Sequence, residues 1–407
     1  MIAGGGIGGL SAALSLAAVG IKSLVLERHD VFCEVGAGIQ LGPNAFHALD
    51  FMGVGQGARR RAVMIEALRL MDAMSAEHVC DIPTAEPFRA RFGNPYAVVH
   101  RGELHSELVE ACRSSPLVSL RTRAEIASFE QDGSRVRIAL TDGEGLTGAA
   151  LIGADGLHSA VRRQLIADGT PRIAGHTTYR AVIPVQQMPE AMRWNAATLW
   201  AGPRCHLVHY PLSDWKAFNL VVTSHDDARE PVAGEPVSHD VVRGAFAHIH
   251  ATPGALIEAA SSWKKWVLCD REPVSAWSQG HVTLLGDSAH PTLQYLAQGA
   301  CMAMEDAVVL AAEMARSKGD LVAAMQRYEQ RRLLRTSHVV LLSRAVGDHI
   351  YHPQGVHAQL RNQIMAAKTS EQWFDHLDWL YGTEDVHKAI AEIAAKVKHE
   401  EMAACLN

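Results

Sequence analysis

The sequence lacks the features that mark a disulfide scaffold, a zinc ribbon or a membrane protein. Its seven cysteines are dispersed among 407 residues, and no two of them form a Cys-x-x-Cys pair. This spacing predicts neither a disulfide framework nor a metal site, and an odd number of scattered thiols suits a reducing cytoplasm. The sequence has no run of about 18 unbroken apolar residues, so no transmembrane helix is expected.

A basic surface is also missing. Lys and Arg number 38 against 44 Asp and Glu, which gives a formal net charge of −6. This balance argues against a nucleic-acid partner, because such partners select a dominant positive face. The length is sufficient for a sizeable core, in two domains or in one elaborated domain.

The N-terminus carries a glycine-rich sequence whose chemistry is specific. Gly4, Gly6 and Gly9 form a G-x-G-x-x-G pattern, which also includes Gly8. In such a pattern the first glycine permits a tight turn, and the second lets the backbone approach a pyrophosphate. The third lets the following helix pack closely on a sheet. Free N–H groups and the positive end of the helix dipole favour the same anion.

The residues around these glycines predict a βαβ unit. A very short apolar run precedes them, a helical run follows at residues 10–19, and a β-type run at residues 21–26 ends at Glu27. Glu27 is placed to accept a hydrogen bond from a ribose hydroxyl. In this full context the pattern predicts an ADP-containing dinucleotide, the alternative being a glycine-rich turn before a core helix.

Two further motifs follow in order along the chain. They are Gly153-Ala154-Asp155-Gly156 with Arg162, and Gly286-Asp287-Ser288-Ala289-His290-Pro291. Together with the first motif they resemble the class A flavoprotein monooxygenases, the single-component FAD aromatic hydroxylases, over nearly the whole chain. The resemblance implies bound FAD, NADH or NADPH as a transient co-substrate, and O2. It also implies a small aromatic acid as substrate, a cytoplasmic monomer or homodimer, and no membrane insertion.

Three more stretches narrow the resemblance. Residues 202–212, 294–300 and 378–382 are similar to those of the 3-hydroxybenzoate 6-hydroxylases, which form gentisate (2,5-dihydroxybenzoate). The related 6-hydroxynicotinate 3-monooxygenases carry His where this sequence has Gln40 and Gln294. A salicylate- or hydroxynicotinate-type hydroxylase stays open as an alternative, as does a non-catalytic FAD-binding redox sensor.

The family implies an α/β fold with three parts. We expect a Rossmann-like FAD-binding domain, an inserted substrate domain with a mixed β-sheet, and a helical C-terminal part. Their expected bounds are 1–70, 98–171 and 271–345 for the FAD-binding domain, 71–97 and 172–270 for the substrate domain, and 346–407 for the helical part. A helix expected from residue 321 to about 343 is predicted to place its arginines, Arg327, Arg331, Arg332 and Arg335, on a solvated face.

The predicted cofactor residues come from the glycine loop and from the positions that match the family. Asp287 follows a buried strand, where a carboxylate can reach a ribose, although a helix cap or turn would also explain it. Asp155 equally suits an Asx turn, and Arg101 a surface salt bridge. Gln40 ends the loop 35–40, whose glycines suit a flat ligand, but a polar strand end is the alternative. The full set is Gly4, Gly6, Gly8, Gly9, Glu27, Arg28, Gln40, Arg101, Asp155, Asp287, Gly299 and Ala300.

The expected chemistry requires a base. Hydroxylation is an electrophilic attack on the ring, and a phenolate is a better nucleophile than a phenol, so a group with a suitable pKa must lie beside the substrate hydroxyl. His206 and Tyr210 lie at i and i+4 of one β-type run, which places both side chains on the same face, while His209 points the other way.

We predict that His206 takes the phenol proton, that Tyr210 donates to or orients the oxygen, and that Gln294 hydrogen-bonds the same region. Without the family match, the usual interpretation of a lone His or Tyr in a strand is a core or surface residue. No arginine stands out as a clamp for the substrate carboxylate.

Overall fold

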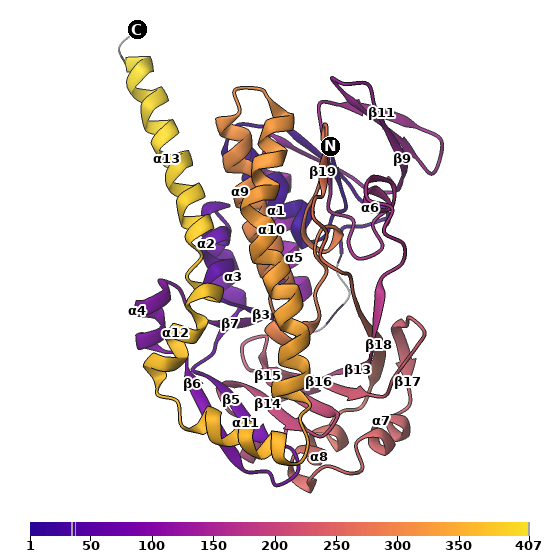
Figure 1. Cartoon of the computed structure of the whole chain (residues 1–407), viewed down its shortest axis with the longest axis vertical. Helices are drawn as coiled ribbons and strands as arrows, with labels where there is room; N and C mark the ends of the chain where they lie inside the picture. The colour runs from indigo at the N-terminus through magenta and orange to yellow at the C-terminus, as the bar shows by residue number, and fades with distance from the viewer. Residues whose placement is uncertain (34–35, 37, 406–407) are drawn as a thin grey trace.

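The computed structural model describes residues 1–33, 36 and 38–405. Residues 34, 35 and 37, part of the loop 35–40 assigned above to a flat ligand, lie outside the described residues. The described chain forms two large sheets with helices packed mainly around the first (Figure 1).

The first sheet is parallel apart from one edge strand, and the glycine motif directly follows its strand β1. Its central strand β1 pairs with β12 on one side and β2 on the other, so the N-terminal βαβ unit lies in the middle of the sheet. The order is β19 (Ser278–Gln279), β20 (Val282–Leu284), β12 (Leu151–Gly153), β1 (Ile2–Ala3), β2 (Ser23–Leu26) and β8 (Val118–Arg121), with β19 antiparallel. This is the Rossmann-like arrangement expected from the sequence.

The second sheet has eight strands and is antiparallel except where β5 meets β14. Its side chains alternate along each strand, which lets one face pack on a core while the other faces the cavity described below. The order is β17 (Ala233–Val237), β18 (Trp263–Asp270), β13 (Arg172–Pro184), β16 (Ala217–His225), β15 (Cys205–Leu212), β14 (Ala196–Gly202), β5 (Ala67–Asp72) and β6 (His78–Pro83).

Two smaller antiparallel sheets complete the β structure. In the sheet β3-β7-β4, Gly38 N–H donates to Asn219 Oδ1 of β16 at 3.0 Å, which ties this sheet to the eight-stranded one. This sheet consists of β3 (Gly38–Leu41), β7 (Ala97–His100) and β4 (Val63–Met64). The other small sheet consists, in order, of β11 (Gly145–Gly148), β10 (Val136–Leu140) and β9 (Ile126–Gln131).

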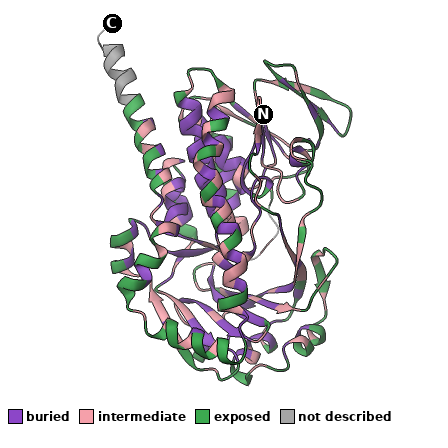
Figure 2. Ribbon diagram, viewed as in Figure 1, coloured by how far each residue is buried: buried purple, intermediate pink, exposed green. Residues whose placement is uncertain are grey.

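Helix α9 is the most deeply buried helix of the fold. It packs against α1, α2, α10 and α13, and Figure 2 shows it buried along most of its length. The α-helices are α1 (Ile7–Ala18), α2 (Pro43–Phe51), α3 (Gly55–Arg61), α4 (Glu86–Phe92), α5 (Arg101–Ser114), α6 (Ala160–Leu165), α7 (His239–Ala245), α8 (Ala251–Glu258), α9 (Gly299–Arg316), α10 (Leu321–Val346), α11 (Val356–Ala366), α12 (Ser370–Tyr381) and α13 (Glu384–Cys405).

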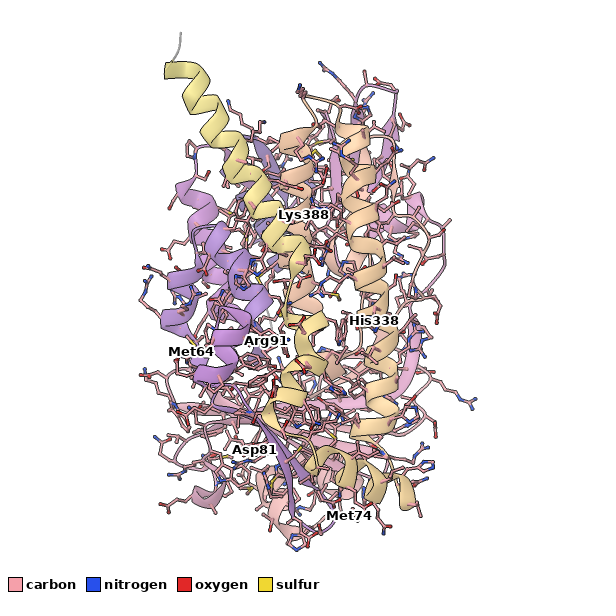
Figure 3. All side chains as sticks on the ribbon, turned by 60° about the vertical axis from the view of Figure 1, so that its left-hand side comes forward. Met64, Met74, Asp81, Arg91, His338 and Lys388 are labelled. Carbon is pink, nitrogen blue, oxygen red and sulfur yellow. The ribbon has the colours of Figure 1, made fainter. Side chains whose placement is uncertain are left out.

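The C-terminal helices cover the side of the molecule where the sheet β3-β7-β4 lies. Arg91 of α4 pairs with Asp375 at 3.1 Å and with Asp378 at 3.2 Å, which holds α12 against α4 (Arg91 is labelled in Figure 3). The aromatic rings of Phe374 and Tyr381 meet those of α4 edge to face. The segment after α10 is therefore helical, as the sequence suggests.

The prediction of a solvated arginine face on α10 was wrong. Arg332 is fully buried between Glu305 and Asp306 of α9, with N–O distances of 2.6 and 2.7 Å. Arg335 also pairs with Glu305, at 2.6 Å. Buried charges survive only when they are paired, and here the acids that pair them are on the neighbouring helix.

This ion network supports the Gly286–Pro291 loop. Asp306 Oδ2 accepts from Gly286 N–H at 3.1 Å and lies 2.6 Å from His290 Nε2. On the other side, Asn44 Nδ2 donates to Glu305 at 2.6 Å. The network thereby joins α2, α9 and α10 to the loop that carries Asp287.

Candidate active site

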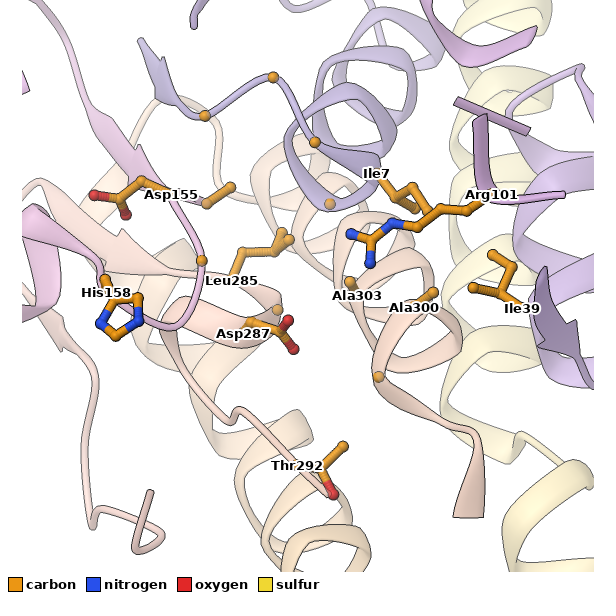
Figure 4. Close-up of a pocket in the computed structure, with 18 of the residues that line it drawn as sticks. Ile7, Ile39, Arg101, Asp155, His158, Leu285, Asp287, Thr292, Ala300 and Ala303 are labelled. Carbon is orange, nitrogen blue, oxygen red and sulfur yellow. The ribbon is translucent and has the colours of Figure 1, made fainter. Parts of the chain in front are cut away.

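A cavity of about 1210 Å³ lies between the two large sheets. One end is lined by the loops at the carboxyl ends of β1, β12 and β20, which is where parallel α/β sheets bind their ligands (Figure 4). The other end is lined by β13, β15 and β16 of the eight-stranded sheet. The cavity therefore joins the predicted cofactor motif to the predicted catalytic strand.

The glycine loop fits the backbone path that the sequence predicts. Gly4 has φ of +99°, and a Cβ there would lie 2.3 Å from the carbonyl oxygen of Ala154. A Cβ on Gly9 would lie 2.0 Å from the carbonyl oxygen of Gly4, so this helix start requires a glycine. Gly6 caps α1, and Gly4, Gly6 and Gly8 line the cavity, whereas Gly9 is not among the lining residues.

Glu27 lies at the end of β2, beside this loop. Its Oε2 accepts from Gly5 N–H and its Oε1 from His29 N–H, both at 2.9 Å. A carboxylate oxygen accepts more than one hydrogen bond, so both oxygens keep capacity for a ribose hydroxyl. Arg28 lines the cavity next to Glu27.

The Asp155 carboxylate is engaged mainly with the protein. It accepts from Ser159 Oγ at 2.5 Å and from Ala160 N–H at 2.8 Å, at the start of α6, and from Ser288 Oγ at 3.2 Å. Asp155 lines the cavity, and its bonds connect the β12–α6 loop to the Asp287 loop.

Asp287, Arg101, Gly299 and Ala300 all line the cavity. Figure 4 shows the Arg101 guanidinium extending into it, with Ala300 at the start of α9 nearby. Positive charge and a helix N-terminus at one place favour an anion or an electron-rich ring atom. Gln40 also lines the cavity and accepts a hydrogen bond from Tyr96 Oη at 2.6 Å.

The three predicted catalytic residues meet at the end of the cavity that β13, β15 and β16 line, which we call the substrate end. His206, Val208 and Tyr210 alternate along β15 and line the cavity, whereas His209 faces away and stacks on Trp200, as predicted. Gln294 Nε2 lies 3.5 Å from His206 Nε2 and donates to Thr223 Oγ1 at 3.0 Å. The juxtaposition of His206, Tyr210 and Gln294 is what the sequence analysis expected.

His206 is almost fully buried, and its second nitrogen has a partner. Its Nδ1 lies 2.7 Å from His352 Nε2. Burial, together with the neighbouring His352 and His176, holds the pKa of His206 well below its usual value. The imidazole is therefore neutral near pH 7, and in the tautomer that donates Nδ1–H to His352 its Nε2 lone pair faces the cavity.

Burial raises the pKa of Tyr210 above its usual value, with Arg180 acting in the opposite direction. Tyr210 thus keeps its phenolic proton at neutral pH and can donate it in a hydrogen bond.

Sequence reasoning missed Arg180, a cation at this end of the cavity. Its Nη2 donates to Gln294 Oε1 at 3.4 Å, and its guanidinium lies 5.3 Å from the centre of the Trp266 ring. Burial and Arg101 lower its pKa, yet an arginine stays charged at any physiological pH. Its Nε is buried with no partner among the described residues. The sign in the sequence was a single arginine inside the apolar run 177–185.

Comparison with known proteins identifies the cofactor. A model described as "FAD binding domain" matches residues 1–343, most of the chain. The chain belongs to this FAD-binding family. This flavoprotein is 51% identical to 3-hydroxybenzoate 6-hydroxylase 1 of Aquipseudomonas alcaligenes over 388 residues, which cover 95% of the chain and 98% of that relative.

Two other proteins support the same assignment. The flavoprotein is 46% identical to 3-hydroxybenzoate 6-hydroxylase of Polaromonas naphthalenivorans, over 94% of the chain and 95% of the relative. HpxO of Klebsiella pneumoniae, solved with FAD and uric acid, superposes with a TM-score of 0.81 at 27% identity, over 96% of this chain and 97% of its own. The chain is thus an FAD-dependent monooxygenase.

The cavity suits FAD on its own evidence. The glycine cradle leaves no space for a Cβ at Gly4 or Gly9, Glu27 offers acceptors, and Arg101 supplies a positive charge. Among the helices of the described residues, none has the length and apolarity to cross a membrane.

Glu27→Ala is expected to weaken FAD binding by about 10- to 100-fold, because a hydrogen bond to a charged group contributes roughly 1.5–3 kcal/mol. The alanine also leaves the N–H groups of Gly5 and His29 without their acceptor. Measuring the FAD dissociation constant by fluorescence on deflavinated protein checks this. Glu27→Gln, which keeps an acceptor in a side chain of equal size, should lose less FAD affinity than the alanine variant. Unchanged FAD affinity in Glu27→Ala would show that Glu27 makes no important contact with the ribose.

Proposed function

We propose that this flavoprotein hydroxylates 3-hydroxybenzoate at ring position 6 to form gentisate, using NADH or NADPH and O2. The names of the two relatives described above support the substrate class. The observation that carries the proposal is the convergence of His206, Gln294 and Arg180 at one end of the FAD cavity. A base and a cation at one place match a substrate that bears both a phenol and a carboxylate.

In this proposal His206 acts on the substrate hydroxyl. Bound FAD, once reduced by NAD(P)H, supplies the activated oxygen that attacks the ring. His206 Nε2 accepts the phenol proton, which raises the electron density of the ring carbon para to the hydroxyl. The interaction of His206 Nδ1 with His352 keeps the imidazole in the orientation that this step needs.

Arg180 is proposed to hold the substrate carboxylate. A buried carboxylate requires a charged or hydrogen-bonding partner, and the Arg180 guanidinium is a cation beside Gln294 in this end of the cavity. Tyr210 is proposed to donate its hydroxyl hydrogen to the substrate oxygen, as the sequence suggested. Fixing the ring at both its hydroxyl and its carboxylate presents one carbon for oxygen transfer.

The proposal extends to the remaining features expected from the sequence. FAD is assigned to residues 1–70, 98–171 and 271–345, and the aromatic ring to the face of the sheet built by 71–97 and 172–270. The described part of the segment 346–407, which is expected to be helical, is assigned to cover one side. A monomer or homodimer in the cytoplasm, where NADH is available, fits the free thiols of the described cysteines.

The test is NAD(P)H oxidation by the FAD-loaded protein with 3-hydroxybenzoate, salicylate, 4-hydroxybenzoate or 6-hydroxynicotinate, with chromatography of the products. Gentisate formed with 3-hydroxybenzoate is the expected result. If another acid stimulates NAD(P)H oxidation and yields a different product, that acid is the substrate in place of 3-hydroxybenzoate. FAD bound without stimulation by any of the four would favour a redox sensor over an enzyme.

Arg180→Met is expected to raise the KM for 3-hydroxybenzoate by about 10- to 100-fold, since a hydrogen bond to a charged group contributes roughly 1.5–3 kcal/mol. The KM for 3-hydroxybenzyl alcohol, which has no carboxylate, should change little. Arg180→Lys serves as the control that keeps the charge. An equal rise for both substrates would show that Arg180 does not bind the carboxylate.

A further inference from the structure

Three histidines from distant parts of the chain meet beneath the substrate end of the cavity. His176 lies on β13, His225 ends β16, and His352 follows the π-helical turn Gly347–Tyr351. One nitrogen from each can be chosen so that all three lie within 4.8 Å of one another. Neutral imidazole nitrogens are common ligands of zinc, copper and nickel. No spacing pattern in the sequence pointed to this group, because its members are 49 and 127 residues apart.

Each histidine has a partner on one ring nitrogen. His176 Nδ1 lies 2.5 Å from Tyr295 Oη, His352 Nε2 lies 2.7 Å from His206 Nδ1, and His225 Nε2 lies 3.4 Å from Asp227 Oδ1. Ligand histidines in metal sites almost always have their second nitrogen hydrogen-bonded in this way, which fixes the ring and its tautomer.

One of the three remaining ring nitrogens is buried and has no partner among the described residues. His352 is 6% exposed, and its Nδ1 is buried without a hydrogen-bond partner among the described residues. A buried imidazole nitrogen without a partner loses its bond to water and gains nothing in exchange. A metal ion within the group would give this nitrogen the contact that the protein does not.

The charges near the group are balanced. Arg204 pairs with Asp227 at 2.7 Å, and Arg172 pairs with Asp270 at 2.8 Å. Asp270 is shared with Arg344, which also pairs with Glu272 at 2.8 Å, so each nearby guanidinium has a carboxylate partner that reduces its repulsion of a bound cation. The side chain of His225 is 27% exposed, so the group has a path to solvent.

We propose that His176, His225 and His352 form a binding site for a divalent transition-metal ion of the zinc class. In a tetrahedral site two Zn–N bonds of about 2.0–2.1 Å place their nitrogens about 3.4 Å apart. Nitrogens that lie within 4.8 Å of one another therefore move together by up to about 1.4 Å around the ion. Three protein nitrogens leave a fourth tetrahedral position for water or for an anion.

The site has a consequence for hydroxylation, which rests on the proposed function. Metal on His352 Nδ1 leaves the proton of this ring on Nε2, which then donates to His206 Nδ1. The single proton of neutral His206 is thereby placed on Nε2, the nitrogen that faces Gln294. His206 can no longer accept the phenol proton, so the bound ion inhibits the enzyme.

The test titrates Zn²⁺ by calorimetry into chelator-treated, tag-free, FAD-loaded protein. We expect one ion per chain, with affinity at least tenfold weaker in both His225→Ala and His225→Asn. His357→Ala, which removes an exposed histidine of α11, is the matched control and should bind as the wild type does. The flavin absorbance of each variant verifies that it is folded. Zinc X-ray absorption should show three imidazole nitrogens at about 2.0 Å.

Equal zinc affinity in the wild type and both His225 variants, or an absorption spectrum without imidazole ligands, would overturn the site. Zinc should also lower wild-type hydroxylation at least tenfold relative to the same enzyme in chelator, and much less in His225→Ala. Zinc bound at the histidines without inhibition would reject only the coupling to His206. Absent hydroxylation in chelator would reject the proposed function, while the binding titration would still decide the metal site.

Discussion

His206→Ala is expected to lower kcat for 3-hydroxybenzoate by about 100-fold or more, because general acid–base catalysis contributes roughly 10²–10⁴. FAD should stay bound, since His206 lies at the substrate end of the cavity and the glycine loop lies at the other. Stopped-flow and steady-state assays of gentisate formation measure the loss.

The pH dependence of the rate distinguishes the loss of a general base from a disruption of the site's structure. The wild-type rate should be flat near neutral pH, because burial keeps the pKa of His206 well below its usual value. In His206→Ala the rate should recover as the pH approaches about 10, where a phenol ionises without help. No recovery at high pH would mean that the variant fails for another reason.

His209→Ala is the matched control on the same strand. His209 is as buried as His206 but points to the opposite face, against Trp200. The His209→Ala variant should have a lower free energy of unfolding than the wild type, with kcat nearly unchanged. If both variants lose activity equally, the damage comes from β15 as a whole and His206 has no special role.

Local sequence patterns were sufficient for the backbone geometry of the glycine loop. The glycine motif reports backbone geometry directly, since Gly4 and Gly9 lie where a Cβ would strike a carbonyl oxygen. Strand alternation was equally reliable, placing His206 and Tyr210 on one face and His209 on the other. Both rules depend only on residues that are close in the chain.

Features that depend on the partner element were missed or mistaken. The arginines of α10 look solvated in isolation, yet their acids are on α9, where Glu305 and Asp306 are fully buried. Arg180 lies on one strand, and only the fold brings Gln294 to it. The same holds for His352, because no spacing rule links it to His206. Helix propensity and periodicity do not report which faces of two elements will meet.

Arg332→Met tests the buried network and should lower the free energy of unfolding by about 3–5 kcal/mol, the usual cost of leaving a buried charge without its partner. Methionine keeps much of the volume, so the loss comes from Glu305 and Asp306, which lose a shared cation. The urea midpoint measures it. Because Asp306 also holds Gly286 and His290, FAD retention should fall in parallel.

Arg316→Met provides the comparison. Arg316 pairs with Glu313 at 3.2 Å, but 47% of its side chain is exposed, and exposed pairs contribute at most about 1 kcal/mol. A loss of the same size in both variants would mean that burial of the Arg332 pairs is unimportant.

The effect of Arg332→Met should also depend on pH. Burial alone would raise the pKa of both acids, but Arg335 and Arg332 lower that of Glu305 to about 2, and His290 and Arg332 lower that of Asp306 to about 2. In the wild type these depressed pKa values stabilise the fold above the unfolded-state values of 4.5 and 3.8. That contribution is lost as the pH falls towards 2.

Without Arg332, burial raises the pKa of at least one of these carboxyls above its unfolded value. Protonation then stabilises the variant below that raised pKa, and this contribution is lost as the pH rises. The stability difference between wild type and variant should therefore be larger at about pH 8 than at about pH 5. A difference that is constant over this range would show that the carboxylates stay ionised without Arg332, held by Arg335, His290 and the Gly286 N–H alone.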